Sequence, residues 1–376
     1  MILTRVSRGV PILLLAVVLA RLAGANEAET RARLVAEADK FERGVSARGM
    51  AYTDPELTPY LAALFAPLAS QTKRGADHCR LVVLREPSGQ SFALANGTVY
   101  LSAGAFARLE GESALSSLLA QKLAELDHEK LLQVASARES GAVAGRVASI
   151  ATTVAAVGVG SPVIPISLFD NAGASLGLLY GAHLDDDAVN HTAQQWLARA
   201  AMTSPRPSAE TFPRATARVR LESLRLAVAW EQYPRALEDI QRELARGSET
   251  AQLRSFEGQC QLGMATSPKH VPKEALPRSV ERRAREQAEA KELARLRVHE
   301  PEQLAQAAKA FRRALELDPA FGPAKRGLGE VLLHQGDRSG AKAVLDEYLA
   351  SNPQASDARY VKKLASQPDA GTGAVR

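Results

Sequence analysis

Apolar positions along most of the chain recur at the three- and four-residue spacing of amphipathic helices. This pattern predicts helices over residues 26–49 and 54–69. Asp54 stands directly before Pro55, which is the usual order of an N-cap and the first helical position. The beginning of the chain is therefore expected to be mainly helical.

Short runs rich in β-branched and aromatic residues follow the second predicted helix. The predicted strands are Arg80–Leu84, Ser91–Leu94 and Thr98–Leu101. Asn96-Gly97 separates the last two and is typical of a hairpin turn. Helices are again predicted over 103–109 and 112–135. Residues 26–221 are therefore expected to form one α+β domain, mostly helical, with a small sheet against its helices.

The N-terminus has the three parts of a secretory signal peptide. Two arginines precede the apolar run Val10–Ala20, and the small-residue motif Ala23–Ala25 follows it. We therefore expect residues 1–25 to be removed and the mature protein to begin at Asn26, in the periplasm or outside the cell. An uncleaved anchor is the alternative interpretation.

Residues 141–180 form an unusually apolar segment. Arg146 and Asp170 are its only charged residues, and Gly158 and Pro162 interrupt its longest uncharged stretch. These breaks argue against a regular membrane-spanning helix. We expect a buried lid or a flap, and peripheral contact with a membrane is a further hypothesis.

The C-terminal part repeats with a period of about 34 residues. The first set of matching positions is Ala307, Phe311, Ala314 and Pro319, and the second is Ala341, Leu345, Tyr348 and Pro353. Together with Leu328-Gly329, they resemble the tetratricopeptide repeat, a pair of stacked helices. Stacked pairs form a groove that can bind a polypeptide, or they can serve only as a structural cap.

The repeat-like region is expected over residues 278–366. Its first unit is degenerate, since Arg295 stands where a small residue belongs, and 254–263 is another weak first helix. A helical connector over 222–277 ends in a Pro/Lys-rich linker that begins at Ser267. The last residues, 367–376, are expected to be a disordered tail.

The stretch Phe92–Gly104 and the helix that begins at Glu112 resemble the zinc metallopeptidases related to the CAAX prenyl endopeptidase and HtpX. In that family a strand pair leads to a helix carrying H-E-x-x-H, and some periplasmic members carry tetratricopeptide repeats after the peptidase domain. The resemblance covers about residues 26–221. It implies a gluzincin-like α+β domain followed by an all-α repeat module.

The zinc chemistry of that family is degenerate in this chain. Gln121 and Glu125 stand at the positions of the two histidines, and Lys122 stands at the position of the glutamate. The ammonium of Lys122 cannot act as the general base. The later Glu ligand corresponds to Asp187, and a histidine near the family's active site corresponds to Phe212. We therefore expect no catalytic residues and no cofactor at these positions.

A reassigned zinc site is the alternative. Glu125 and His128 share a face of the predicted helix, and Asp187 could complete a Glu/His/Asp site. The simpler expectation is that Lys122 forms an ion pair with Glu125 or Glu129 and fills the space that a metal would occupy.

Charge and cysteine content add little. The formal net charge is +5, and residues 1–25 contribute three arginines and no acid, so the remainder carries +2, too little to indicate a nucleic-acid partner. Cys79 and Cys260 could pair in an oxidising compartment, or both could remain buried thiols.

The combined hypothesis is an exported pseudo-metallopeptidase with protein-binding repeats. It would bind envelope or secreted polypeptides in its cleft or repeat groove, as an adaptor or chaperone-like factor in envelope protein quality control or assembly. The alternatives are a divergent active zinc metalloendopeptidase and a membrane-touching scaffold that uses the apolar segment 141–180.

Overall fold

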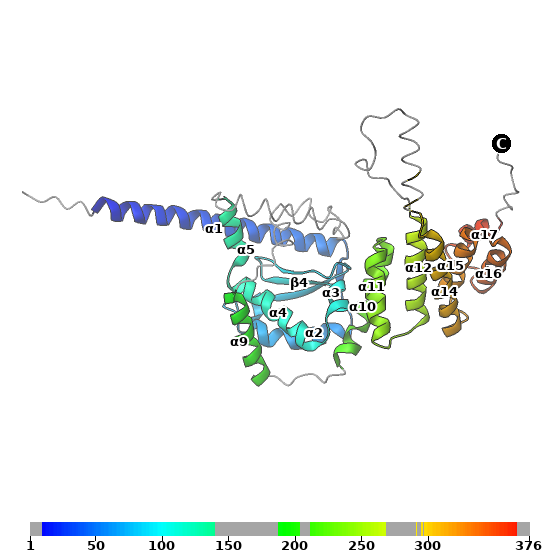
Figure 1. The fold of residues 1–376 in the computed structure, drawn as a ribbon. Helices are drawn as coiled ribbons and strands as arrows, with labels where there is room; N and C mark the ends of the chain where they lie inside the picture. Colours follow the sequence, from blue (N-terminus) through cyan, green and yellow to red (C-terminus); the bar gives the residue numbers. More distant parts are fainter. Residues whose placement is uncertain are drawn as a thin grey trace, which may run out of the picture. The chain divides into compact units, whose positions relative to one another are not determined.

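The computed structural model describes residues 10–139, 187–203, 211–267 and 297–366, together with Lys291 and Arg295. The chain divides into two compact units, residues 1–223 and 224–376, and the boundary lies within one helix. The described residues are mostly helical and contain a small sheet in the first unit (Figure 1). This agrees with the expected mostly helical architecture.

The first unit contains helices on both sides of its sheet. Its helices are α1 (Val10–Ala47), α2 (Leu57–Ala69), α3 (Ala103–Arg108), α4 (Glu112–Asp127), α5 (Lys130–Glu139), α9 (Asp187–Thr203) and α10 (Thr211–Ala229), the last crossing the unit boundary. Its strands are β1 (Ala51–Tyr52), β2 (Arg80–Leu84), β3 (Ser91–Ala93) and β4 (Thr98–Ser102), and a 3₁₀ turn, Ala76–His78, precedes β2.

The sheet has the strand order β1-β2-β4-β3. β2 and β4 are parallel, and the two outer pairs are antiparallel. The three predicted strands are confirmed to within one residue, whereas the very short β1 is not predicted by the sequence pattern. Gly97 closes the β3–β4 hairpin with φ +89°, and a Cβ there would lie 2.1 Å from the carbonyl oxygen of His78, so the turn requires glycine.

Successive side chains along a strand point to opposite faces of the sheet, so the core has two layers. Figure 1 shows helices on either side of β4. On one side, Phe41 of α1 packs against Phe92 and Tyr100, with ring centroids 5.8 Å and 5.2 Å apart. On the other side, Val99 and Leu101 face the buried side chains of α2, α4 and α9. The sheet therefore carries α1 on one face and α4 on the other.

Asp54 holds the turn that leads into α2, although the helix begins at Leu57 and not at the predicted Pro55. Its carboxylate accepts hydrogen bonds from the backbone N–H groups of Glu56 and Leu57, at 2.8 Å and 2.9 Å. Burial opposes ionisation, but these donors and Arg218 outweigh it and hold the pKa of Asp54 below its ordinary value. The carboxylate therefore holds this turn and the first N–H of the helix in its charged form.

The prediction of a single helix over 112–135 is wrong, because the helix is interrupted after Asp127 and a second helix begins at Lys130. Glu129 has φ +51°, a left-handed conformation that a continuous helix does not contain. The side-chain amide of Gln133 donates to the carbonyl oxygen of His128 at 2.9 Å and replaces a lost helical bond. The helix α5 therefore leaves α4 in a new direction.

Several expectations fall at or beyond the limits of the described residues. Helix α1 runs without a break from Val10 through the predicted cleavage site. No helix among the described residues is sufficiently long and apolar to cross a membrane. The apolar segment 141–180, most of the linker from Ser267 and the tail 367–376 lie outside the described residues, so the expectations for them remain predictions.

The second unit consists of helices in its described part. They are α11 (Tyr233–Ala245), α12 (Ala251–Thr266), α14 (Glu300–Leu317), α15 (Gly322–His334), α16 (Arg338–Ser351) and α17 (Ala358–Ala365). α12 packs against α14, α15 packs against α16, and one buried cluster joins these four helices. α17 closes the end of α16 around Val361, which is fully buried.

Candidate functional site

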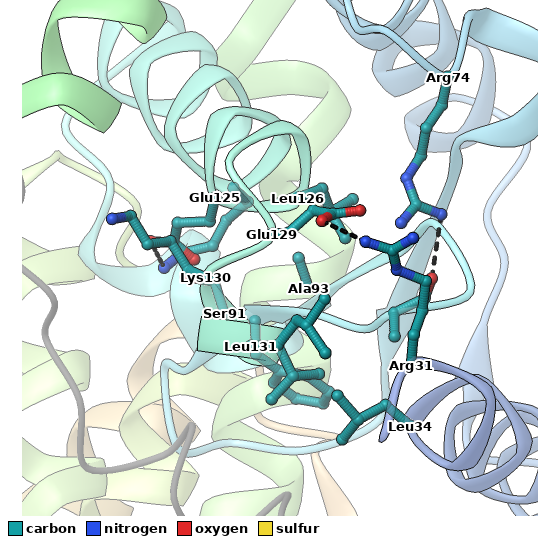
Figure 2. A pocket seen from close by; sticks show the side chains of 14 residues that line it. Arg31, Leu34, Arg74, Ser91, Ala93, Glu125, Leu126, Glu129, Lys130 and Leu131 are labelled. Carbon is teal, nitrogen blue, oxygen red and sulfur yellow. Dashed lines mark hydrogen bonds and ion pairs between the residues drawn. The ribbon is translucent and has the colours of Figure 1, made fainter. Parts of the chain in front are cut away.

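A groove in the first unit brings together the helix that resembles the family's zinc helix and the edge of the sheet. It is a shallow groove bordered by α1, β3, α4 and α5 (Figure 2). Leu34, Ala93, Leu126 and Leu131 supply apolar surface. Charged side chains surround it, so the groove combines apolar and polar surface, as ligand-binding clefts in general do.

Among the described strands, β3 is the outer one on the side of this groove. It lies at the end of the sheet, and its antiparallel register pairs Phe92 with Tyr100. Hydrogen bonds from Leu94 N to Thr98 O and from Ser102 N to Gln90 O show that even-numbered β3 residues bond to β4. The backbone groups of Ser91 and Ala93 therefore point away from β4, and both residues line the groove.

Lys122 and Glu125 form an ion pair beside that edge. The two residues lie one helical turn apart on α4, and Lys122 Nζ donates to Glu125 Oε1 at 2.6 Å. Their side chains are 12% and 17% exposed, respectively, so both charges are largely shielded from water. An unpaired charge here would be unfavourable, which explains why the two side chains stay together.

Two arginines from distant parts of the chain complete the charged rim. The Arg31 guanidinium lies 2.7 Å from the Glu129 carboxylate, and Arg74 donates to the carbonyl oxygen of Ala95 at 3.0 Å (Figure 2). Lys130 lines the same groove. The sequence pattern does not indicate these cations, because only the fold brings α1, the loop before β2 and α5 to α4.

The other positions carried over from the resemblance do not meet at this groove. Phe212 is buried in the core, with its ring 6.5 Å from that of Tyr60. Asp187 is the exposed first residue of α9, a helix that packs against α4. His128, at the end of α4, shares a hydrogen bond of 2.9 Å with the hydroxyl of Thr192 on α9.

The donor set at these positions does not fit zinc. Gln121 offers a neutral amide, and Glu125 is already neutralised by an ammonium. Over the described ranges, no three His, Cys, Asp or Glu side chains lie close enough together to hold a metal ion. Glu125, His128 and Asp187 therefore do not form such a group in this structure.

The two cysteines are free and buried, Cys79 in the first unit and Cys260 in the second. Cys79 Sγ lies 3.6 Å from the Thr72 hydroxyl. Burial raises the pKa of the Cys260 thiol to about 12, so this thiol is protonated and unreactive at neutral pH. They form no disulfide in this structure.

The second unit shows the spacing of the predicted repeat as packing. Phe311 and Leu345 are fully buried, and so are the alanines four positions before them, Ala307 and Ala341. A Cβ added to Gly329 would come within 2.4 Å of the Leu345 side chain, so glycine allows α15 and α16 to approach closely. The 34-residue period of the sequence therefore reflects the same kind of contact between helices, repeated along the chain.

Comparison with known proteins identifies this region. Residues 299–366 match the tetratricopeptide repeat family, which confirms the predicted repeat. A search of curated proteins gave no match, and the family comparison does not support a relation to the zinc metallopeptidases. Residues 299–366 are thus a tetratricopeptide-repeat segment, the kind of stacked-helix surface that binds other proteins.

Proposed function

We propose that this protein is an adaptor that binds polypeptides. The observation that carries the proposal is the tetratricopeptide-repeat segment at residues 299–366. Such helix pairs stack into extended surfaces, and each pair adds area without changing the fold. The finer role is that of a chaperone-like factor for envelope or secreted polypeptides.

The groove of the first unit is a second binding surface in this proposal. Ser91 and Ala93 offer backbone donors and acceptors at the outer edge of β3, and a partner strand can pair with them. The apolar surface around Leu126 and Leu131 accommodates its side chains. The resemblance aligns Lys122 with the general base of the metallopeptidases, and its ammonium is paired with Glu125, so in this proposal the groove binds a polypeptide without cleaving it.

We also propose that the protein is exported. The arrangement of charged, apolar and small residues over 1–25 supports cleavage before Asn26. N-terminal sequencing of the protein isolated from its host tests this proposal. Intact Met1 on the mature chain would contradict it.

Fluorescently labelled casein, an unfolded polypeptide, tests the binding role. Full-length protein is expected to bind it, and Ser91→Pro is expected to weaken binding about fivefold, because one outward N–H bond worth about 1 kcal/mol is lost. Proline is tolerated at an edge position whose N–H takes no part in the ladder. Fluorescence anisotropy measures the affinity, and thermal unfolding verifies that the variant folds.

Ser91→Thr is the matched control, because threonine retains the N–H group and suits a strand. It is expected to bind casein as the unsubstituted protein does. Equal affinity of the Ser91→Pro variant and the unsubstituted protein would exclude the β3 edge as a binding surface. Absence of casein binding by full-length protein would count against the general polypeptide-binding role.

A further inference from the structure

We infer that α12 and α14 are the two helices of a single tetratricopeptide-type repeat, interrupted by a long insertion. The array then continues back through α11, well before the segment that matches the family. Only the part that concerns partner binding rests on the proposed function. The helix pairing itself follows from contacts within the second unit.

The α12–α14 contact repeats the α15–α16 contact. A Cβ on Gly258 would lie 2.8 Å from the ring of Phe311, and one on Gly329 would lie 2.4 Å from Leu345. Phe311 and Leu345 are one repeat period apart, so they are equivalent second-helix positions. Gly258 is therefore the first-helix equivalent of Gly329, in place of Arg295, to which the sequence period assigned this position.

The length of the insertion follows from this equivalence. The numbers of Gly329 and Ala341 differ by 12 and those of Gly258 and Ala307 by 49, so the excess is 49 − 12 = 37. Between Thr266 at the end of α12 and Glu300 at the start of α14 lie 299 − 266 = 33 residues, against 337 − 334 = 3 between α15 and α16, so 33 − 3 = 30 of the extra residues lie in this connection. The other 37 − 30 = 7 lengthen the adjoining ends of α12 and α14. A sequence comparison that requires a fixed period cannot join the two helices across the insertion.

The direction of packing also matches that of a repeat. Glu249, just before α12, bridges Arg254 near the start of α12 and Arg313 near the end of α14; Arg313 Nε and Nη2 lie 3.0 Å and 2.9 Å from its two oxygens. Leu262, late in α12, shares a buried cluster with Ala307 of α14. The start of α12 thus lies near the end of α14, and the helices are antiparallel.

The same register continues into α11. Ala236 and Ile240 are both fully buried, and they precede Ala307 and Phe311 by one repeat period plus the length of the insertion. The turn before α11 also matches the turn before α16. Gln232 N donates to the carbonyl oxygen of Ala227, and Asp337 N donates to that of Leu332, which is the same sequence separation.

The consequence is a larger partner surface. α12 contacts α15 directly, so the first helices of successive repeats stand side by side. A polypeptide bound along the first helices would then contact both. Residues 299–366 alone lack one helix of the pair that buries Phe311, and we expect them to fold poorly and to lose the casein binding of the full chain.

A cleavable linker tests the pairing in the full-length chain. A specific protease site is inserted after Val271, within the insertion, and the purified protein is cut there. The two fragments are expected to co-elute in gel filtration and to separate only in denaturant. Separation without denaturant into two folded fragments would overturn the inference, whether or not the protein binds casein.

A glycine substitution provides a second measurement. Gly258→Leu is expected to lower the Tm of the unfolding transition of the second unit by on the order of 5 °C, because the leucine side chain clashes with Phe311. Gly44→Leu in α1 is the control, since nothing lies within 4 Å of a Cβ there. An unchanged Tm for the Gly258→Leu variant would contradict the pairing.

Discussion

Replacement of Phe311 by alanine is expected to lower the free energy of unfolding of the second unit by about 3–5 kcal/mol. The ring is fully buried, and it fills the space that Gly258 on one side and Gly327 on another leave open. Because glycine has no side chain with which to fill a void, the cavity left by alanine cannot be closed from either side. Urea unfolding followed by far-UV circular dichroism measures the loss.

Val298→Ala is the matched control for this substitution. Its side chain is 66% exposed, so the change is expected to stay within about 0.5 kcal/mol. A loss below about 1 kcal/mol for Phe311→Ala would show that the ring is not enclosed by α12 and α15. That outcome would also weaken the inferred repeat, since both rest on the same contact.

The elements that can be predicted from sequence are those whose signals are local. The β3–β4 hairpin is predictable because Asn96-Gly97 is a turn signal and the flanking residues favour strands. The burial of Phe311 and Leu345 follows from their spacing alone, since equal spacing on stacked helices implies equal environments.

The features that sequence patterns do not reveal depend on distant parts of the chain. The break between α4 and α5 occurs at Glu129, a left-handed residue that is neither glycine nor asparagine and gives no local signal. The pairing of α12 with α14 is hidden because the insertion removes the repeat period. The Lys122–Glu125 pair of the groove can be foreseen, because the two are neighbours on one helix, whereas Glu129, the other candidate partner, pairs with Arg31 from the distant helix α1.

The structure also limits what the metallopeptidase resemblance can mean. Strand β4, the short helix α3 and then α4 follow one another in the predicted order. Phe212, however, lies in the core with Tyr60, and the family that matches is that of the repeats. The resemblance therefore remains a hypothesis about ancestry, and the chemistry of the groove must be judged from its own side chains.

Breaking the Lys122–Glu125 pair is expected to have the largest effect on the groove. Glu125→Ala leaves an ammonium that is 12% exposed without its partner at 2.6 Å, and we expect a loss of about 2 kcal/mol in the free energy of unfolding of the first unit. Lys122→Ala is expected to cost a similar amount. Chemical denaturation of the first-unit transition measures both.

The double variant Lys122→Met with Glu125→Leu separates pairing from burial. Apolar side chains of similar volume leave no charge unpaired, so its loss is expected to be less than the sum of the two single losses by about 1–2 kcal/mol. The Lys342–Asp346 pair on α16 is the control, with side chains 62% and 52% exposed. Removing Lys342 is expected to cost less than about 0.5 kcal/mol.

The same pair predicts the response to zinc. At about 4 Å and an effective dielectric constant near 20, an ammonium repels a dication by roughly 8 kcal/mol, which opposes metal binding next to Lys122. Adding equimolar zinc or a chelator is therefore expected to leave the Tm of the first unit unchanged, and casein is expected to remain uncut. About one zinc per chain, with casein cleavage abolished by chelator and by Glu125→Ala, would replace the ion-pair interpretation with that of a divergent metalloendopeptidase.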